Sequence, residues 1–159
     1  MGRQLARRIN ARFYDSDQVI EQRLGCLISE YFEREGETAF RDLEETVLNE
    51  LTALTAGVLS TGGGSILRAT NRHHLRTRTQ TVYLHSSPDE VFRRLRHDQT
   101  RPLLQVADPL ARLRELYAAR DPLYRQTAHF VVETGRPSVL MLVGTILGQL
   151  EQAGVLSPP

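Results

Sequence analysis

The chain has 159 residues, of which 40% are hydrophobic and 25% are charged. These values are ordinary for a soluble globular protein and allow one domain with a core of its own. Twenty basic and 19 acidic side chains leave a formal net charge of +1, which gives no electrostatic basis for binding nucleic acid or a membrane surface. Every basic residue is arginine, so no lysine is present to hold a phosphate group or to act as a base.

Cys26 is the single cysteine. One cysteine excludes a disulfide framework and a thiolate metal site, and it fits a reducing cytoplasm. We expect no signal peptide. The most apolar run, Val139 to Leu150, is interrupted by glycine and polar residues and is too short to span a bilayer. A cytoplasmic, monomeric protein without membrane contact is therefore predicted.

Helical and strand patterns alternate along the chain. Helices are expected, in chain order, at residues 2–11, 18–24, 29–35, 37–54, 68–78, 87–97 and 108–119, in a short segment after a turn at 120–122, and at 138–152. Strands are expected at residues 12–15, 57–60, 80–85 and 129–133. This alternation predicts an α/β fold, with a single domain over residues 1–159 and a parallel sheet covered by helices on both faces.

The strand at 57–60 runs into three consecutive glycines, Gly62, Gly63 and Gly64, and a helical pattern starts near Ile66. Glycine lacks a Cβ and permits positive φ, so backbone N–H groups in such a turn can approach a ligand closely. The carboxyl end of a strand is also where ligands bind in open α/β sheets. Taken alone, the same glycines are equally typical of a flexible strand-to-helix turn.

The polar residues near this turn also have structural interpretations. Asp15 and Asp17 are suited to a turn and a cap for the helix at 18–24. Arg41 is spaced to pair with Glu45 at i,i+4, an exposed contact of little energetic weight. Taken one at a time, these residues do not distinguish a binding site from local helix chemistry.

The remaining candidates can likewise be structural. Two arginines are expected in solvated loops, two phenylalanines in the core and two histidines in solvent: Arg101, Arg120, Phe13, Phe40, His73 and His74. No histidine has zinc-ligand spacing with a carboxylate or a cysteine. No zinc site is predicted.

Five short segments, in their order and spacing, resemble the shikimate kinases. They are Phe13-Tyr14-Asp15-Ser16-Asp17; Gly36-Glu37 with Phe40-Arg41 and Glu44; Thr61-Gly62-Gly63-Gly64; Arg101-Pro102-Leu103-Leu104; and Arg120-Asp121-Pro122-Leu123-Tyr124. The resemblance covers almost the whole chain and implies the nucleoside-monophosphate-kinase-like branch of the P-loop NTPase fold. It implies an enzyme that transfers the γ-phosphoryl group of ATP to the 3-hydroxyl of shikimate, on the route to chorismate and the aromatic amino acids.

The resemblance also implies roles for the residues on the shikimate side. Arg41 and Arg120 would clamp the shikimate carboxylate, which a planar guanidinium fork binds with two parallel hydrogen bonds. Asp17 would accept hydrogen bonds from the ring hydroxyls and orient, or deprotonate, the attacking one. The turn of Gly62, Gly63 and Gly64 would offer backbone N–H groups to the substrate. These features weaken the alternative of a related small-molecule kinase such as gluconate kinase.

On the nucleotide side, the resemblance implies a lid at about residues 98–107. Arg101, within this lid, would neutralise charge on the transferred phosphoryl group when the lid closes over ATP. Arg136 would lie against the adenine, and Asp15 would sit near Mg²⁺, through water. ATP and Mg²⁺ are therefore the expected cofactors, and shikimate is the expected small-molecule partner.

The sequence departs from the family pattern at its start. The phosphate-binding loop G-x-x-x-x-G-K-[ST] does not occur in it, and its first residues resemble the helix that follows this loop in the family. In the family's sheet order, 2-3-1-4-5, the first strand is central, so we expect its absence to leave two separate strand pairs.

Two explanations fit this departure. Either the natural protein carries the loop upstream of Met1, or the chain is a degenerate shikimate-binding or partner-binding homologue without kinase activity. The residues on the shikimate side are all in place, which favours the first explanation. As written, the chain is expected to turn over very slowly or not at all, because the phosphate-binding loop is missing from it.

Overall fold

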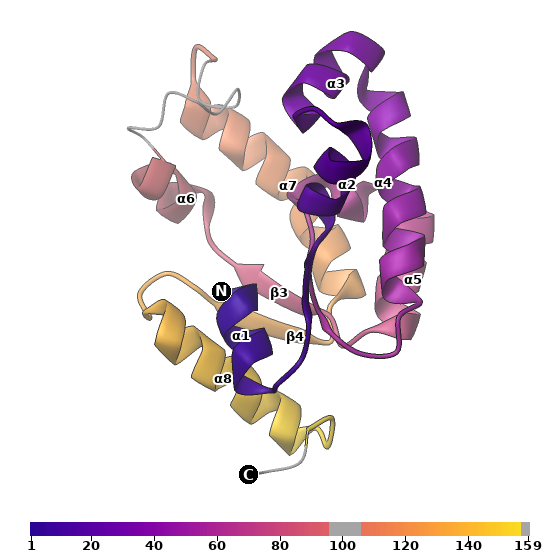
Figure 1. Cartoon of the computed structure of the whole chain (residues 1–159). Coiled ribbons are helices and arrows are strands. Elements are labelled where there is room, and N and C mark those ends of the chain that lie inside the picture. Colours follow the sequence, from indigo (N-terminus) through magenta and orange to yellow (C-terminus); the bar gives the residue numbers. More distant parts are fainter. Residues whose placement is uncertain (96–105, 157–159) are drawn as a thin grey trace. The chain divides into compact units, whose positions relative to one another are not determined.

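The computed structural model describes residues 1–95 and 106–156. The chain forms two compact units, Met1–Gln80 and Thr81–Pro159 (Figure 1). Within the described residues, each unit contains one pair of parallel strands with helices beside it. The α/β class expected from the alternating pattern is confirmed, while the single domain over residues 1–159 stays a prediction.

The first unit begins with a helix and then alternates strands with helices. Its elements are α1 (Gly2–Arg8), β1 (Phe13–Asp15), α2 (Ser16–Leu24), α3 (Ile28–Glu35), α4 (Glu37–Thr52), β2 (Val58–Ser60), the 3₁₀ turn η1 (Gly63–Leu67) and α5 (Ala69–Arg78). Strands β1 and β2 are parallel, and Asp15 pairs with Ser60 at their carboxyl ends. The segments that follow the two strands therefore leave the sheet at the same edge.

The core of the first unit is built from apolar faces of its helices. Ile20 of α2 and Phe40 and Val47 of α4 are at most 5% exposed and form its centre. Partly buried apolar side chains pack around them: Val19, Leu24, Ile28, Tyr31, Leu43 and Leu51. Gly25 ends α2 with a φ of 70°, a left-handed conformation that glycine adopts without strain. This turn lets α3 follow at once and pack against both α2 and α4.

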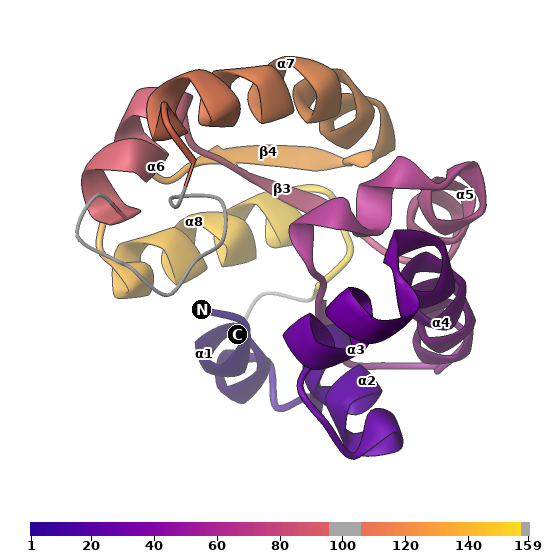
Figure 2. The same ribbon diagram turned by 90° about the horizontal axis from the view of Figure 1, so that it is seen from above.

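The second unit is a two-stranded parallel sheet between helices. Its elements are β3 (Val82–His85), α6 (Pro88–Leu95), α7 (Pro109–Thr127), β4 (Phe130–Glu133) and α8 (Val139–Gln152). Helix α7 lies on one side of β3 and β4, and α8 lies on the other (Figure 2). His85 pairs with Glu133 at the carboxyl end of this sheet.

The helix starts of the second unit follow local sequence rules. Glu90 donates its backbone N–H to Ser87 Oγ at 3.2 Å, and the Glu90 carboxylate accepts from Ser87 N at 3.3 Å. This reciprocal pair is a capping box. Ser138 caps α8 by accepting a hydrogen bond from the backbone N–H of Met141. Among the described residues, no helix is long and apolar enough to cross a bilayer.

Helix α7 corrects the expected turn at residues 120–122. The structure has one helix from Pro109 to Thr127, with Pro122 inside it, although an internal proline usually ends or kinks a helix. Next to this proline, Asp121 accepts a hydrogen bond from Tyr83 of β3 at 2.8 Å, which holds the helix on the sheet. Arg120 is therefore a helical residue, and its expected place in a loop is wrong.

The strand pairing agrees with the expectation from the family's sheet order. Within the described part of the chain, β1 pairs with β2 and β3 pairs with β4. The helical pattern expected from Ile66 differs in detail, because the chain first forms η1 and then an extended residue, Arg68, before α5 begins.

Candidate active site

Acidic side chains and the glycine turn meet at the carboxyl edge of β1 and β2. Asp15 is the last residue of β1, and Asp17 lies in the first turn of α2. The glycine turn follows Ser60, the residue that pairs with Asp15. Parallel pairing therefore brings two segments that are far apart in the sequence to one edge of the sheet.

Asp15 caps α2. Its Oδ1 accepts hydrogen bonds from the backbone N–H groups of Asp17, at 3.0 Å, and Gln18, at 3.4 Å. The cap interpretation is therefore confirmed for Asp15. Asp17 itself is not the cap: it is a helical residue whose carboxylate is left for other contacts.

The carboxylate of Asp17 lies against the backbone of Gly62. A Cβ added to Gly62 would stand 3.1 Å from Oδ1 and 3.2 Å from Oδ2 of Asp17, which leaves little room for any side chain there. Burial raises the pKa of Asp17, and the carboxylates of Asp15 and Glu21 raise it further, while Arg41 acts in the opposite direction. A carboxylate in such a setting accepts a proton more readily than an exposed one.

The guanidinium group of Arg41 is packed on Gly64. A Cβ at residue 64 would overlap Nη1 and Nη2 of Arg41 and would stand 2.6 Å from its Cζ. The side chain of Arg41 is only 14% exposed, and its Nη1 donates to Glu44 Oε1 at 2.9 Å. Nε is buried without a hydrogen-bond partner among the described residues, since Glu37 Oε1 is 3.7 Å away. Arg41 is thus held in place with one donor still unused.

Glu44 is a site residue to which the sequence interpretation gave no role. Its side chain is 2% exposed; burial raises its pKa, and the hydrogen bond from Arg41 opposes this rise. The expected pair of Arg41 with Glu45 is wrong, because Glu45 and Asp42 both bind Arg68, at 3.2 and 2.6 Å. The i,i+3 spacing of Arg41 and Glu44 was the signal that could have found the true partner.

The glycine turn is held by hydrogen bonds to its carbonyl groups. Ser65 Oγ donates to the carbonyl of Gly62 at 2.8 Å, and the buried Asn71 donates from Nδ2 to the carbonyl of Ser65 at 2.9 Å. Arg72 Nη1 donates to the carbonyls of residues 66 and 67. Helix α5 therefore fixes the turn from one side through two of its side chains.

Glycine is needed in this turn for close approach and not for an unusual backbone. None of Gly62, Gly63 and Gly64 has a positive φ, so the turn does not use this conformational freedom of glycine. What the turn requires is the missing Cβ, because the carboxylate of Asp17 and the guanidinium of Arg41 occupy the space that side chains would take.

Arg120 lies on α7 in the second unit and is partly buried. No hydrogen bond or ion pair within the described part of the chain engages its side chain. Its convergence with Arg41 on one ligand stays a prediction. Arg101 and residues 98–105 of the expected lid lie outside the described residues.

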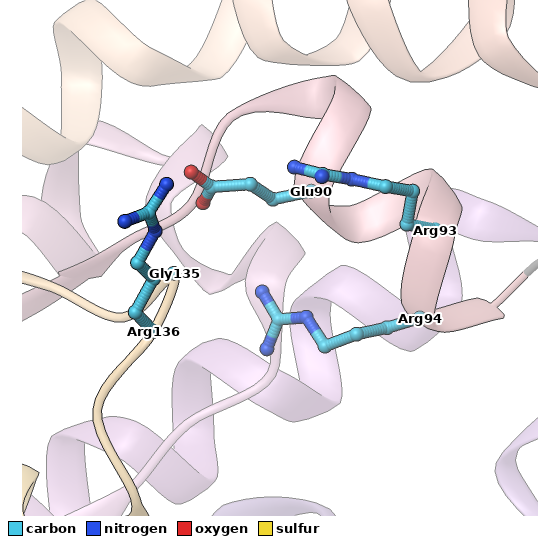
Figure 3. A pocket seen from close by; sticks show the side chains of 5 residues that line it. All are labelled: Glu90, Arg93, Arg94, Gly135 and Arg136. Atoms are coloured by element: carbon cyan, nitrogen blue, oxygen red, sulfur yellow. The ribbon is translucent and has the colours of Figure 1, made fainter.

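Arg136 lines a hollow of about 370 Å³ in the second unit (Figure 3). Glu90, Arg93 and Arg94 of α6 line the same hollow together with Gly135. The Glu90 carboxylate lies close to the backbone of Gly135, where a Cβ would stand 2.8 Å from Oε1. The sequence interpretation missed Arg94. It lies four residues after Glu90 in α6, on the same face of the helix, and lines the same hollow as Arg136.

No group of three or more His, Cys, Asp and Glu side chains in residues 1–95 and 106–156 is arranged to hold a metal ion. The two neighbouring histidines of α5 differ from each other. His73 is exposed, as expected, whereas His74 is partly buried and its Nδ1 has no hydrogen-bond partner among the described residues. Burial, followed by the charges of Arg78 and His73, lowers the pKa of His74.

Residues 1–151 match a family model described as shikimate kinase. A shikimate kinase of Paracidovorax citrulli is 57% identical over 161 residues, which cover 99% of this chain and 88% of that protein. One of Ralstonia nicotianae is 52% identical over 159 residues, which cover 100% of this chain and 84% of that protein. The chain belongs to the shikimate kinase family.

A solved structure agrees with this assignment. A shikimate kinase from Acinetobacter baumannii, in complex with shikimate, matches with a TM-score of 0.90 and 43% identity, covering 98% of this chain and 87% of that one. These matches confirm the family resemblance that the five segments indicated. Shikimate kinases are transferases that use ATP. The individual site residues stay predictions. Of these, Asp17, Arg41 and the glycine turn come together in the first unit, and Arg120 and Arg136 belong to the second.

Proposed function

We propose that this chain transfers the γ-phosphoryl group of ATP to the 3-hydroxyl of shikimate, in the biosynthesis of chorismate and the aromatic amino acids. The observation that carries the proposal is the arrangement at the glycine turn. The Asp17 carboxylate lies against Gly62, and the Arg41 guanidinium lies against Gly64. A carboxylate and a guanidinium group are thus held against glycines that are two residues apart in the turn. Such a pair suits a small acid that also carries hydroxyl groups.

Arg41 is proposed to bind the carboxylate of shikimate. Its Nη1 donates to Glu44, whereas its Nε is buried without a hydrogen-bond partner in the described residues and makes only a long ion pair with Glu37, at 3.7 Å. Nε and Nη2 can therefore form two parallel hydrogen bonds to a carboxylate. Arg120 is proposed as the second guanidinium of the same clamp. Two such forks fix the direction of the acid, and with it the position of the hydroxyl that reacts.

Asp17 is proposed to orient the attacking hydroxyl and to accept its proton. As the oxygen of the hydroxyl bonds to the γ-phosphorus, the bond between that phosphorus and the bridging oxygen breaks, and ADP leaves. The raised pKa of Asp17 suits it to hold the proton during this step. The backbone of Gly62, Gly63 and Gly64 is proposed to donate hydrogen bonds to the substrate from the turn.

The hollow of the second unit is proposed to hold the adenine end of ATP. Arg136 is expected to lie against the adenine, and Arg94 of α6 lines the same hollow. The flat guanidinium groups stack on an aromatic base, which makes arginine suited to this role. Arg101 is proposed to neutralise charge on the transferred phosphoryl group.

Mg²⁺ is proposed to lie near Asp15, with water between them. Asp15 uses Oδ1 to cap α2, and its Oδ2 makes no hydrogen bond to the described residues. One available oxygen fits an indirect contact through water and does not fit a direct chelate. When bound, the ion neutralises charge on the β- and γ-phosphates.

The runner-up function, a shikimate-binding or partner-binding homologue without kinase activity, is not favoured by the similarity to shikimate kinases. Residues 1–159 do not contain a G-x-x-x-x-G-K-[ST] loop. Release of ADP should be measured on residues 1–159 and on a chain extended at the N-terminus by such a loop. We expect turnover from the extended chain and very little from residues 1–159. An inactive extended chain would make the kinase proposal wrong. The cytoplasmic location and the monomeric state stay predictions.

Calorimetric titration with shikimate tests the clamp. Arg41→Ala and Arg120→Ala should each weaken binding about tenfold or more, since a charge-assisted hydrogen bond contributes about 1.5–3 kcal/mol. Arg68→Ala is the matched control, because Arg68 pairs with Asp42 and Glu45 and has no proposed contact with shikimate. A loss much smaller than about 1.5 kcal/mol at both positions would argue against charged hydrogen bonds to a carboxylate.

A further inference from the structure

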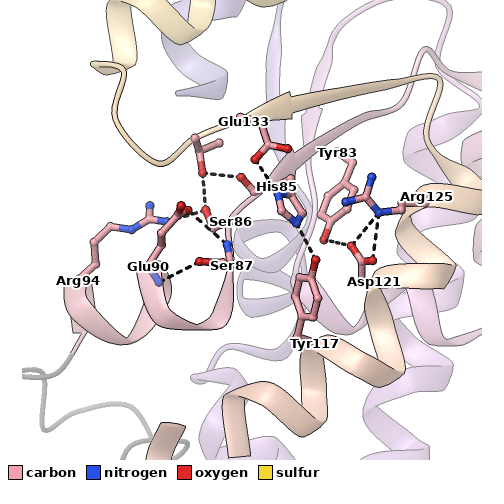
Figure 4. A network of polar contacts seen from close by, with 11 residues as sticks. Tyr83, His85, Ser86, Ser87, Glu90, Arg94, Tyr117, Asp121, Arg125 and Glu133 are labelled. Atoms are coloured by element: carbon pink, nitrogen blue, oxygen red, sulfur yellow. Dashed lines mark hydrogen bonds and ion pairs between the residues drawn. The ribbon is translucent and has the colours of Figure 1, made fainter.

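Arg120 sits beside a residue that is bound firmly to the sheet. Tyr83 Oη donates to Asp121 Oδ1 at 2.8 Å, and Arg125 Nε donates to Oδ1 and Oδ2 of the same carboxylate at 3.2 and 3.0 Å (Figure 4). Tyr83 belongs to β3, so this contact ties α7 to the strand. The tie falls on the residue that immediately follows Arg120.

A second tie lies one turn earlier in α7. The hydroxyl of Tyr117 is 2.8 Å from His85 Nε2, and His85 Nδ1 is 2.7 Å from Glu133 Oε2 of β4 (Figure 4). Tyr117 precedes Arg120 by three residues, so the two share one face of the helix. Arg120 therefore lies between two residues of α7 that are held by β3: Tyr117 before it contacts His85, and Asp121 after it accepts from Tyr83.

The backbone at this point needs such support. Pro122 has no N–H, so it cannot donate the usual helical hydrogen bond to the carbonyl of Ala118, and its ring crowds that carbonyl. The turn from Ala118 to Pro122, which carries Arg120, therefore lacks one backbone hydrogen bond of the helix. Side-chain contacts to β3 hold it where the backbone cannot.

The same contacts also keep the carboxylate of Asp121 from pairing with the guanidinium group of Arg120. An adjacent free carboxylate would compete for the guanidinium of Arg120. Burial acts to raise the pKa of Asp121, but the hydrogen bonds from Tyr83 and Arg125 outweigh it, and the pKa is lowered. Asp121 is therefore ionised and already fully engaged, and Arg120 makes no ion pair within the described residues.

We propose that Tyr83 and His85 are positioning residues for Arg120, acting through Asp121 and Tyr117. By holding the proline-weakened turn and by occupying Asp121, they set the guanidinium of Arg120 in the orientation that binds the substrate carboxylate. This inference rests on the proposed function of Arg120 as half of the carboxylate clamp.

The test compares shikimate with its methyl ester, which lacks the negative charge. Tyr83→Phe and Tyr117→Phe each remove one hydroxyl and keep the ring, and Asp121→Asn keeps the shape of the side chain. Each variant should weaken shikimate binding about three- to tenfold in calorimetry, the effect of one or two hydrogen bonds. Binding of the ester should change less than about twofold, because the ester makes no charged contact with Arg120. A general loss of structure would affect both ligands alike.

A double-mutant cycle with Arg120→Ala isolates the proposed route. If Asp121 acts through Arg120, adding Asp121→Asn to Arg120→Ala should cause no further loss of shikimate binding. Glu115→Gln is the matched control, since it breaks an exposed ion pair with Arg112 on the same helix and should leave both ligands unaffected. Melting temperatures show whether each variant is folded. If Tyr83→Phe or Tyr117→Phe does not fold, the double-mutant cycle of Asp121→Asn with Arg120→Ala still tests the positioning role.

The outcomes separate this inference from the function on which it rests. No effect of Arg120→Ala on shikimate binding would make the clamp itself wrong. A clear effect of Arg120→Ala, with equal losses from Asp121→Asn in the presence and absence of Arg120, would overturn the positioning role alone. Equal losses for shikimate and its ester in the tyrosine variants would overturn it as well.

Discussion

The guanidinium group of Arg41 rests on the Cα of Gly64. A Cβ at residue 64 would overlap both terminal nitrogens of Arg41 and would stand 2.6 Å from Cζ. The overlapping atoms belong to the end of a flexible side chain and not to the backbone. A methyl group at this position would therefore move the guanidinium and leave the fold intact.

Gly64→Ala is expected to weaken binding more than it lowers stability. The guanidinium group of Arg41 is displaced from its position against the turn, so shikimate binding should weaken about tenfold or more, as for loss of a charged hydrogen bond. The melting temperature should fall less than it does on removal of Arg41, because the guanidinium group that pairs with the buried Glu44 is shifted and not lost. Titration calorimetry and thermal unfolding of the same sample measure the two effects. Full affinity in this variant would show that Arg41 does not bind shikimate from its observed position.

The control for Gly64→Ala is the same substitution in a place with open space. Gly144 lies exposed within α8, and a Cβ there meets nothing within 4 Å. Gly144→Ala should stabilise the protein by about 0.5–1 kcal/mol, the cost of glycine in a helix interior, and should not change shikimate binding.

Removal of Arg41 is expected to cost stability as well as binding, because it leaves a buried acid without its partner. Glu44 has a side chain that is 2% exposed and accepts from Arg41 Nη1 at 2.9 Å. Arg41→Ala should lower the free energy of unfolding by about 1–3 kcal/mol in urea at neutral pH. The pKa of Glu44, already raised by burial, should rise further without the guanidinium.

The double variant Arg41→Ala with Glu44→Gln distinguishes the two effects of this removal. Replacing the buried acid by a neutral amide should recover part of the lost stability, because no charge is then left unpaired. Shikimate binding should stay weak, since the guanidinium is still absent. Recovery of binding together with stability would assign Arg41 a structural role only.

The parts of the fold that depend on local chemistry could be predicted from the sequence. The capping box of Ser87 and Glu90 specifies the start of α6 within four residues, and the cap by Asp15 does the same for α2. The identity of each described strand and its pairing followed from alternation and from the family's sheet order. The glycine turn was found because three glycines at the end of a strand are a local pattern.

The parts that depend on distant contacts could not be predicted. Whether Arg41 pairs with Glu44 or Glu45 depends on which face of α4 meets the glycine turn. Glu45 instead binds Arg68, which also binds Asp42, 26 residues away in the sequence. The expected break at residues 120–122 ignored Tyr83, which is 38 residues from its partner Asp121. Helix propensity alone cannot anticipate such a contact, because tertiary packing overrides it.

Asn71 is expected to determine how firmly the glycine turn is held. It is 1% exposed, and its Nδ2 donates to the carbonyl of Ser65 at 2.9 Å. Asn71→Ala leaves this carbonyl without its partner and should destabilise the protein by about 1–3 kcal/mol. Thr70→Ala, at the exposed neighbouring position of α5, is the control and should have an effect within about 0.5 kcal/mol. Urea unfolding measures both, and equal effects would contradict a specific role for Asn71.

Asp17 should make the stability of the protein depend on pH with a definite sign. Burial, then the charges of Asp15 and Glu21, raise its pKa above the ordinary value of 3.8. Between pH 3.8 and the raised pKa, the folded state binds more protons at this position than the unfolded state does. The free energy of unfolding therefore falls as the pH rises through this window. The stabilising contribution of the protonated carboxyl is fully present below pH 3.8 and is lost above the raised pKa.

Asp17→Asn removes this titration and is expected to have opposite effects on stability and on catalysis. At pH 7 the variant should be more stable than the wild type, and the difference should shrink as the pH falls and vanish below about pH 3.8. In the chain extended by the phosphate-binding loop, phosphoryl transfer should fall about 10²- to 10⁴-fold, the usual contribution of a positioned general base. Unfolding curves across the pH range, paired with ADP release at pH 7, measure both effects. A variant that is less stable at neutral pH, or one that keeps full turnover, would show that Asp17 has the ordinary role of a helix residue.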